Sequence, residues 1–133
     1  MVITIDIDIG IPVYRQIMDQ IRFQIASGVL KTEDELPSTR SLSTELSINP
    51  MTISKAYSSL EKEGIIQRRP GRSLVVAPRS TQETILEKER QLEDVLLPAG
   101  RIAQQLGFSP QEALDIFQTV LDHVFQDQLR RAK

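Results

Sequence analysis

Cysteine is absent from the 133-residue chain, and histidine occurs once, as His123. Without cysteine there can be no disulfide, no thiol nucleophile and no thiolate ligand for a metal. A single histidine excludes most zinc sites and most catalytic triads that need an imidazole. The chain also lacks a glycine-rich phosphate loop, and its acidic residues are scattered. We therefore expect no enzyme activity, no metal site and no cofactor.

Long apolar runs are missing as well. No uninterrupted stretch approaches the about 20 apolar residues that span a bilayer, and the first residues lack the basic region and apolar core of a signal peptide. We expect a cytoplasmic location and no membrane partner. The length leaves room for one ordinary domain, or for a small domain with an appendage.

The two signs of charge nearly balance, because 16 basic residues face 18 acidic ones and the formal net charge is −2. The distribution is uneven: residues 49–78 carry five basic and two acidic residues, while the segments on either side are net negative. Exposed charges are screened beyond roughly 8 Å at physiological salt, so a local excess matters more than the sum. The positive segment favours phosphate binding, with a merely solvated basic loop as the alternative interpretation.

The first half of the chain shows two kinds of apolar spacing. Residues 2–9 alternate isoleucine with polar residues, which is typical of a half-buried strand. Helical spacing then predicts three helices, at about 12–27, 39–46 and 50–63. Ser38 and Asn49 are suitable N-caps for the second and third of these helices. Only a three-residue break separates that pair, as in a helix-turn-helix.

Two short strand-like runs follow, at 65–69 and 73–77. Pro70 and Gly71 lie between them and fit the central positions of a tight turn, so we expect a hairpin with an arginine-rich tip. Three helices followed by such a hairpin make a winged helix. The predicted fold class is therefore mainly α with a small β wing, in which residues 1–78 form a winged helix-turn-helix domain (helix-turn-helix about 38–57, wing about 65–77).

Residues 79–133 are predicted to be helical after a linker at 78–83. Pro98 predicts a kink or a break, and a capping box from Ser109 to Glu112 begins the last helix. So small a helical region buries too little surface alone, and we expect its apolar side to form a homodimer. The expected dimerisation residues are Ile85, Leu92, Leu96, Ile102, Leu106, Phe117, Val120, Leu121 and Val124.

A helix of this kind fits the major groove of DNA, where its N-terminal residues face the base edges. Met51, Thr52 and Lys55 lie in the N-terminal half of the third helix and could reach bases or phosphates. Each has a plainer interpretation: Met51 as a packing residue, Thr52 as a partner of the Asn49 cap, and Lys55 as a surface charge.

Arg40 lies in the first turn of the second helix, from which its side chain could reach the groove beside the third helix. A salt bridge to Glu33 or Glu35 is the alternative. Arginines at the tip of the predicted wing could lie against the DNA backbone or enter the minor groove.

These segments together resemble the winged helix-turn-helix of GntR-type transcription regulators. The residues that carry the resemblance are Leu36 to Tyr57, Leu60 to Gly64 and Gly71, with Pro12 to Ile17 and Gly28 to Leu30 before them. The short helical tail, including Leu106 to Glu112, resembles the YtrA-like subfamily, which lacks a large effector domain.

The resemblance implies a bacterial homodimeric repressor that binds a double-stranded DNA operator with two related half-sites. It also implies DNA contacts at Arg40, at the start of the third helix and around the wing glycine. Together, pattern and resemblance nominate as DNA-binding residues Ser38, Thr39, Arg40, Asn49, Met51, Thr52, Ser54, Lys55, Arg69, Gly71 and Arg72. The subfamily implies control of a nearby transporter operon, and a cleft at the dimer interface could bind a small-molecule effector.

The chain departs from the family pattern at several positions. Ser43 and Ser47 stand where alanine and glycine are usual, so Ser47 is expected to hold a strained turn conformation. Pro50 and Met51 replace an arginine-containing pair, which leaves Arg40 and the wing to carry more of the specificity. The alternative function is a winged-helix protein-interaction module, which gains support if Lys55 and the wing arginines are paired with carboxylates.

Overall fold

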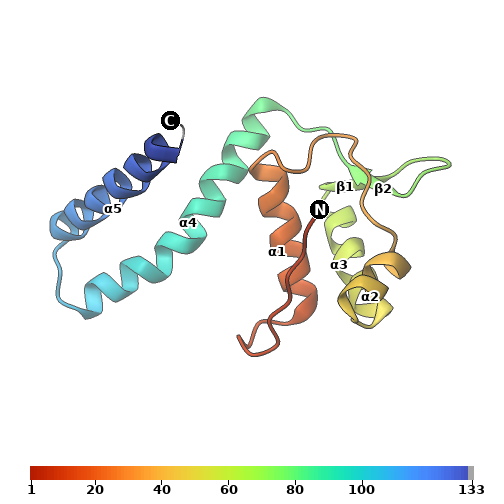
Figure 1. Cartoon of the computed structure of the whole chain (residues 1–133), viewed down its shortest axis with the longest axis horizontal. Coiled ribbons are helices and arrows are strands. Elements are labelled where there is room, and N and C mark those ends of the chain that lie inside the picture. The colour runs from red at the N-terminus through yellow and green to blue at the C-terminus, as the bar shows by residue number, and fades with distance from the viewer. Residues whose placement is uncertain (132–133) are drawn as a thin grey trace. The chain divides into compact units, whose positions relative to one another are not determined.

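The structure is a computed structural model that describes residues 1–131. Its elements (Figure 1) are α1 (Val13–Ala26), α2 (Thr39–Leu46), α3 (Pro50–Lys62), β1 (Ile66–Arg68), β2 (Leu74–Val76), α4 (Thr81–Gln105) and α5 (Pro110–Arg131). The predicted fold class is confirmed: a mainly helical chain with a two-stranded wing. Its contacts divide it after Glu89 into a first unit, residues 1–89, and a tail unit, whose described part is residues 90–131.

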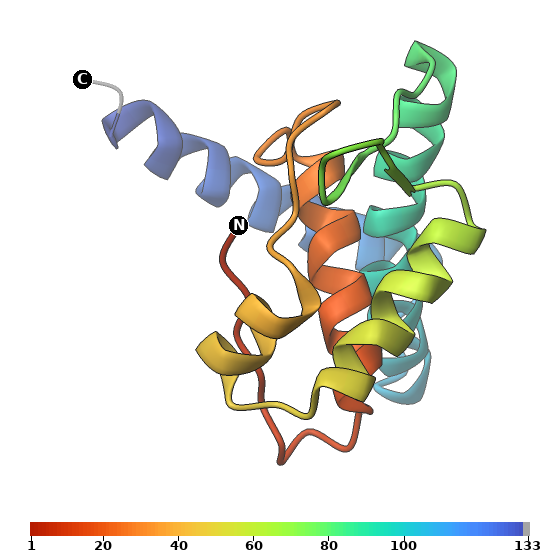
Figure 2. The same ribbon diagram turned by 90° about the vertical axis from the view of Figure 1, so that its right-hand side faces the viewer.

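The core of the first unit lies where α3 packs against both α1 and α2. Figure 2 shows α1 and α3 side by side, with α2 beside the start of α3. Ile17 and Ile21 of α1 meet Leu42 of α2 and Ile53 and Leu60 of α3, and all five side chains are fully buried. Because apolar residues three or four positions apart share one face of a helix, the predicted spacing produces this core directly.

The N-terminal residues do not form the predicted strand. They run beside α1 (Figures 1 and 2), and glutamine side chains of that helix take the place of a partner strand. Gln20 accepts from the Thr4 amide at 2.9 Å and donates to the Thr4 carbonyl at 2.6 Å. Gln16 makes the same exchange with Asp6, at 2.9 and 2.8 Å. With its backbone satisfied by side chains, the segment buries Ile3 but leaves Ile7 exposed.

The wing gains a third backbone segment that the sequence did not predict. β1 and β2 are antiparallel, with Gln67 opposite Val75. Glu35 forms an isolated bridge with Val75 on the other side of β2. The Leu36 amide donates to the Leu74 carbonyl at 2.8 Å, which anchors the segment before α2 to the wing. The predicted polar loop therefore lies against β2.

The tail elements begin and end at residues that the sequence marked. Ser109 and Glu112 form the predicted capping box, each donating its amide to the other's side chain, at 2.9 and 3.1 Å. Gly107 has a φ of +84° and ends α4, while Pro98 lies inside that helix, so the expected interruption is not a break. No helix within residues 1–131 is both long enough and apolar enough to cross a membrane.

Candidate nucleic-acid interface

The turn between α2 and α3 is fixed by short-range hydrogen bonds. Ser38 caps α2 by accepting from the Ser41 amide at 3.0 Å, and Asn49 caps α3 by accepting from the Met51 amide at 2.9 Å. Ser47 adopts the left-handed conformation with a φ of +55°, which confirms the strained turn expected at this position. That conformation costs a non-glycine residue about 1 kcal/mol. The two helices are thereby held in a helix-turn-helix.

One side of α3 is largely exposed in the first unit. Ile53 is fully buried, whereas Ser54 and Lys55 are exposed and Thr52 is partly exposed. Met51 has 77% of its surface exposed, so the interpretation of this residue as a packing side chain is wrong. The exposed side therefore includes the N-terminal residues that were expected to face DNA.

Lys55 does not extend freely into solvent. Its Nζ atom lies 3.9 Å from the centre of the Tyr14 ring of α1, which is cation–π geometry. The ring comes from a helix that is distant in sequence, so no local pattern could have predicted this contact. Lys55 therefore already has a partner in Tyr14, and any contact that its ammonium group makes with phosphate competes with this one.

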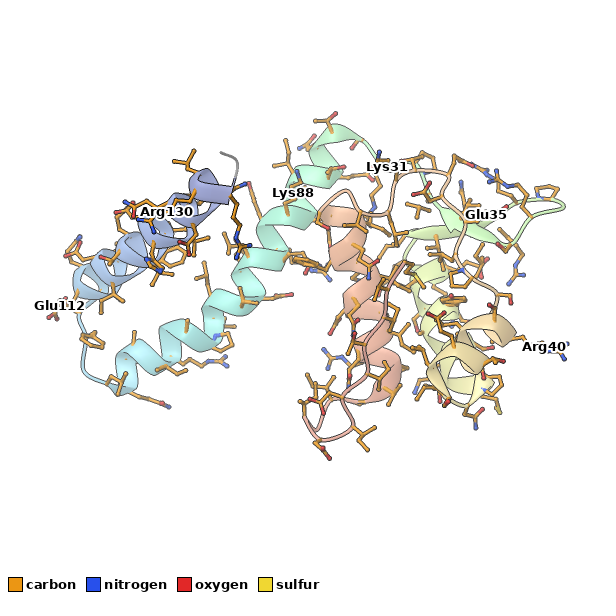
Figure 3. The ribbon with its side chains drawn as sticks, viewed as in Figure 1. Lys31, Glu35, Arg40, Lys88, Glu112 and Arg130 are labelled. Atoms are coloured by element: carbon orange, nitrogen blue, oxygen red, sulfur yellow. The ribbon has the colours of Figure 1, made fainter. Side chains whose placement is uncertain are left out.

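Arg40 lies in the first turn of α2, and its side chain points away from the rest of the first unit (Figure 3). The alternative in which Arg40 pairs with Glu33 or Glu35 is wrong, because both glutamates pair with arginines of the wing. Within the described residues no carboxylate lies within salt-bridge distance of Arg40. Its guanidinium group is therefore available to an external anion.

The tip of the wing forms the predicted turn. The Arg72 amide donates to the Arg69 carbonyl at 3.1 Å, closing a four-residue turn around Pro70 and Gly71. Gly71 has a φ of +70°, which glycine adopts without the steric cost that a side chain would add. The tip is exposed, so its backbone is accessible at the position where a DNA contact is expected.

The arginines at that tip are held by carboxylates. Arg69 donates two hydrogen bonds to the Glu33 carboxylate, one of them from Nε at 3.3 Å. Arg72 donates from Nε to the Glu35 carboxylate at 2.8 Å. Its Nη1 atom lies 3.8 Å from Oε2 of Glu33. The hydrogen bond from Arg69 lowers the pKa of Glu33 below its ordinary value. These contacts, here called the wing pairs, exist because residues 33–36 lie along β2.

The charge of the positive segment is partly offset by other pairs as well. Arg68 lies 3.7 Å from Glu61, and Glu63 pairs with Arg22 of α1. The excess of basic residues over 49–78 is therefore not a bare positive strip. Exposed pairs of this kind contribute little to stability, and an incoming phosphate can exchange with the carboxylate.

The tail unit holds most of the residues nominated for dimerisation. Among those nominated, Leu106 is 68% exposed and Val120 is 49% exposed. Leu96, Phe117 and Leu121 are partly exposed; the others are also exposed, and Ile85 belongs to the first unit. A hollow of about 570 Å³ between α4 and α5 has mostly apolar walls, including Ile102 and Phe117. The tail thus presents apolar side chains that its own helices do not cover.

Comparison with known proteins places this geometry among transcription regulators. The sequence profile of the family described as "Bacterial regulatory proteins, gntR family" matches residues 13–76, from the start of α1 to the end of β2. The HTH-type transcriptional repressor YtrA of Bacillus subtilis (strain 168) is 40% identical over 85 residues. That match covers 64% of this chain and 65% of the length of YtrA, which is less than two thirds of that relative.

Two further similarities extend into the tail. The uncharacterized HTH-type transcriptional regulator YhcF of the same B. subtilis strain is 32% identical over 109 residues, covering 81% of this chain and 88% of YhcF. The solved structure of YtrA from Sulfolobus acidocaldarius, a GntR-family transcription factor, superposes with a TM-score of 0.55 at 34% identity. It covers 92% of this chain and 98% of that one, so the likeness includes both the winged helix and the helices after it.

Proposed function

Because this chain belongs to the GntR family of bacterial regulatory proteins, we propose that it is a cytoplasmic, dimeric repressor that binds operator DNA in front of a bacterial operon. The proposal rests above all on the exposed N-terminal side of α3 beside an unpaired Arg40. An exposed helix has the diameter that fits the major groove, and the Arg40 guanidinium group can bind a base edge or a phosphate there. This arrangement supports the proposal that the protein reads duplex DNA.

The proposed DNA contacts fall into two groups. The N-terminal half of α3 enters the major groove, and Arg40 contacts a base edge or a phosphate beside it. The sugar-phosphate backbone of the DNA is contacted by the side of the turn that carries Ser38, Thr39 and Asn49. The exposed wing tip around Gly71 contacts the DNA backbone as well. Arg69 and Arg72 reach phosphate only by leaving Glu33 and Glu35, so they contribute less than two free arginines would.

The tail is proposed to join two copies of the chain. Apolar side chains such as Ile102 and Leu106 are more than half exposed in the single chain, and covering them is favourable by roughly 25 cal/mol per Å² of apolar surface. A two-fold dimer presents two α3 helices to half-sites about 34 Å apart, one turn of DNA. A second hollow of about 820 Å³, lined by Glu93 and Arg101 among others, is the proposed place for a small-molecule effector.

The test is selection of genomic fragments that the purified full-length protein retains, followed by footprinting of the best fragment. We expect two protected half-sites, and binding that weakens with salt with a log–log slope of about −0.9 for each phosphate neutralised. Arg40→Ala is expected to weaken binding by roughly tenfold or more, as loss of a good base or phosphate contact does. Arg130→Ala, an equal loss of charge in α5, serves as the control and is expected to bind like the unaltered protein.

The wing pairs favour one other function, a winged-helix module that binds a protein and not DNA. Pairing of Arg69 and Arg72 with carboxylates removes much of the charge that DNA binding uses. The same selection separates the two functions. A protein that retains no fragment even at low salt, while remaining folded, would contradict the repressor and favour the interaction module.

A further inference from the structure

The exposed side of α3 is unusually poor in groups that read bases by strong hydrogen bonds. Its first two turns offer the short hydroxyl groups of Thr52 and Ser54, while the ammonium group of Lys55 lies over the Tyr14 ring. It has no arginine, glutamine or glutamate in its first two turns. Arginine or lysine binds the guanine edge by two hydrogen bonds, and asparagine or glutamine binds the adenine edge. Of these residue types the first two turns of α3 hold only Lys55, whose ammonium group is engaged by Tyr14. If α3 recognises the base sequence, as the proposed function requires, it must distinguish base pairs mainly by contacts other than paired hydrogen bonds.

Met51 is the large apolar side chain on this side, and the start of α3 holds its backbone in place. The preceding Asn49 caps the helix through the Met51 amide itself, at 2.9 Å. Pro50 occupies the first helical position, where its ring holds the backbone in helical geometry. The side chain nevertheless has 77% of its surface exposed. An apolar group is thus presented to solvent from a rigid backbone at the end of α3 that is proposed to face the groove.

The major groove offers an apolar partner at one kind of base pair. The 5-methyl group of thymine projects into the groove, whereas the remaining edge groups are hydrogen-bond donors and acceptors. A methionine thioether is flexible and polarizable and packs well around a methyl group. Contact between the two would remove apolar surface of both from water. The hydroxyl groups next to Met51 are small enough to let it approach the groove floor.

We propose that Met51 is a specificity-determining residue that recognises the 5-methyl group of a thymine in each half-site. The inference rests on the proposed function, since it assigns a role within the same DNA interface. Met51 then supplies base discrimination in α3 by apolar contact, and Arg40 supplies the charged contact from α2. The operator is accordingly expected to hold a T·A pair, in symmetric positions, that cannot be exchanged for an unmethylated pair without loss.

The experiment begins with the highest-affinity duplex selected by the full-length protein from a random library. Each thymine of that duplex is replaced in turn by deoxyuridine, which removes the methyl group and leaves the pairing edge intact. We expect one symmetric thymine position at which uracil weakens binding by about fourfold per half-site, the ratio that burial of one methylene group gives. Met51→Ala should bind the thymine duplex more weakly and should not distinguish thymine from uracil there.

Two controls keep the result interpretable. Ser58→Ala, on the same exposed side of α3, should retain the full thymine preference. The thermal unfolding temperature of Met51→Ala should match that of the unaltered protein, because the side chain packs against little in the first unit. If the unaltered protein ignores every uracil replacement, or if Met51→Ala keeps the preference, the inference is overturned while sequence-specific binding stands. If selection enriches no duplex, the proposed function and this inference fall together.

Discussion

The first unit and the tail unit are both built from amphipathic helices, yet they bury their apolar faces to very different extents. Within the described residues, every buried apolar side chain lies in the first unit, from Ile3 to Ala77. α5 has no buried residue at all. Similar helical patterns therefore end in a self-sufficient core in one unit and in an uncovered surface in the other. The first unit thus has a core of its own within one chain, whereas the tail leaves apolar surface that the proposed dimer would cover.

The largest effect is expected from a charge placed on the uncovered apolar surface of the tail. Leu106→Asp should convert the proposed dimer to a monomer, because the substitution would bury an unpaired carboxylate at the proposed interface. Affinity for a duplex with two half-sites should then fall by roughly 10²–10⁴-fold, as expected when two linked contacts become independent.

Sedimentation velocity and titration of duplexes with one and two half-sites measure the two effects of Leu106→Asp. Gln126→Glu adds a charge of the same sign at an exposed polar position of α5 and should change neither. A Leu106→Asp protein that stays dimeric would show that the apolar face of the tail is not the interface.

A cavity in the core of the first unit should lower the stability of the fold without changing how chains associate. Ile53 is fully buried between the helices, so Ile53→Ala should lower the free energy of unfolding by about 2–5 kcal/mol. The loss should be independent of protein concentration, since the core belongs to one chain. Urea denaturation at two protein concentrations measures it, with Ile102→Ala in the tail as the comparison. A concentration-dependent loss for Ile53→Ala would contradict a self-sufficient first unit.

A smaller effect is expected from one hydrogen bond between α3 and the residue before the α2 cap. The Tyr57 hydroxyl donates to the Pro37 carbonyl at 2.8 Å. Burial raises the pKa of Tyr57, so the phenol remains a donor at every working pH. Tyr57→Phe should cost about 1 kcal/mol of unfolding free energy, measured by urea denaturation, with the dimer unchanged. Loss of the dimer instead would mean that the two units are not independent.

The smallest expected effect is a gain in DNA binding within the first unit. Glu33→Gln should free Arg69 and raise affinity for random duplex by about threefold, with a salt slope steeper by about 0.9 for one added phosphate contact. Because the pKa of Glu33 is lowered in the folded protein, its charged pair is present above the ordinary carboxyl range and is lost only as pH falls through the lowered value. Gel-shift titrations at pH 7 therefore test the closed pair.

Glu89→Gln makes the same change in charge and is the control for this measurement. Its binding to random duplex should stay close to that of the unaltered protein. Weaker binding of Glu33→Gln would reverse the interpretation and make Glu33 a residue that orients Arg69 toward DNA.

The local features of this fold could be predicted, because each depends on residues a few positions apart. Ser38 and Asn49 were recognisable as caps from their neighbours, whereas the left-handed turn at Ser47 was expected from the family resemblance, in which glycine is usual there. The bounds of α2 and α3 agree with the predictions to within one residue. Caps, turns and apolar spacing are encoded locally, so the helix-turn-helix was accessible from the sequence.

The missed features all depend on segments that are far apart in the chain. Nothing near Lys55 indicates that Tyr14 lies beneath its ammonium group, and nothing near Arg69 indicates that Glu33 faces it. The alternation over residues 2–9 was right about Ile3 and Ile5, which face the core, but Ile7 and Ile9 are exposed, and the pattern carried no information on the hydrogen-bond partner. Glutamine side chains of α1 supplied what a strand would have supplied. The nominated DNA contacts and the tail interface remain predictions.

The wing pairs bear on how quickly such a protein would find its operator. A genome offers millions of random sites, and time spent on each of them delays arrival at the right one. Free arginines would lengthen every stop, because phosphate is the same everywhere along the duplex. Arginines already held by Glu33 and Glu35 gain little from random phosphate, so the protein dissociates or slides on sooner. The carboxylates beside the wing would thus shorten the time that the protein needs to find its operator. The contacts in the final complex with the operator would not reveal this effect.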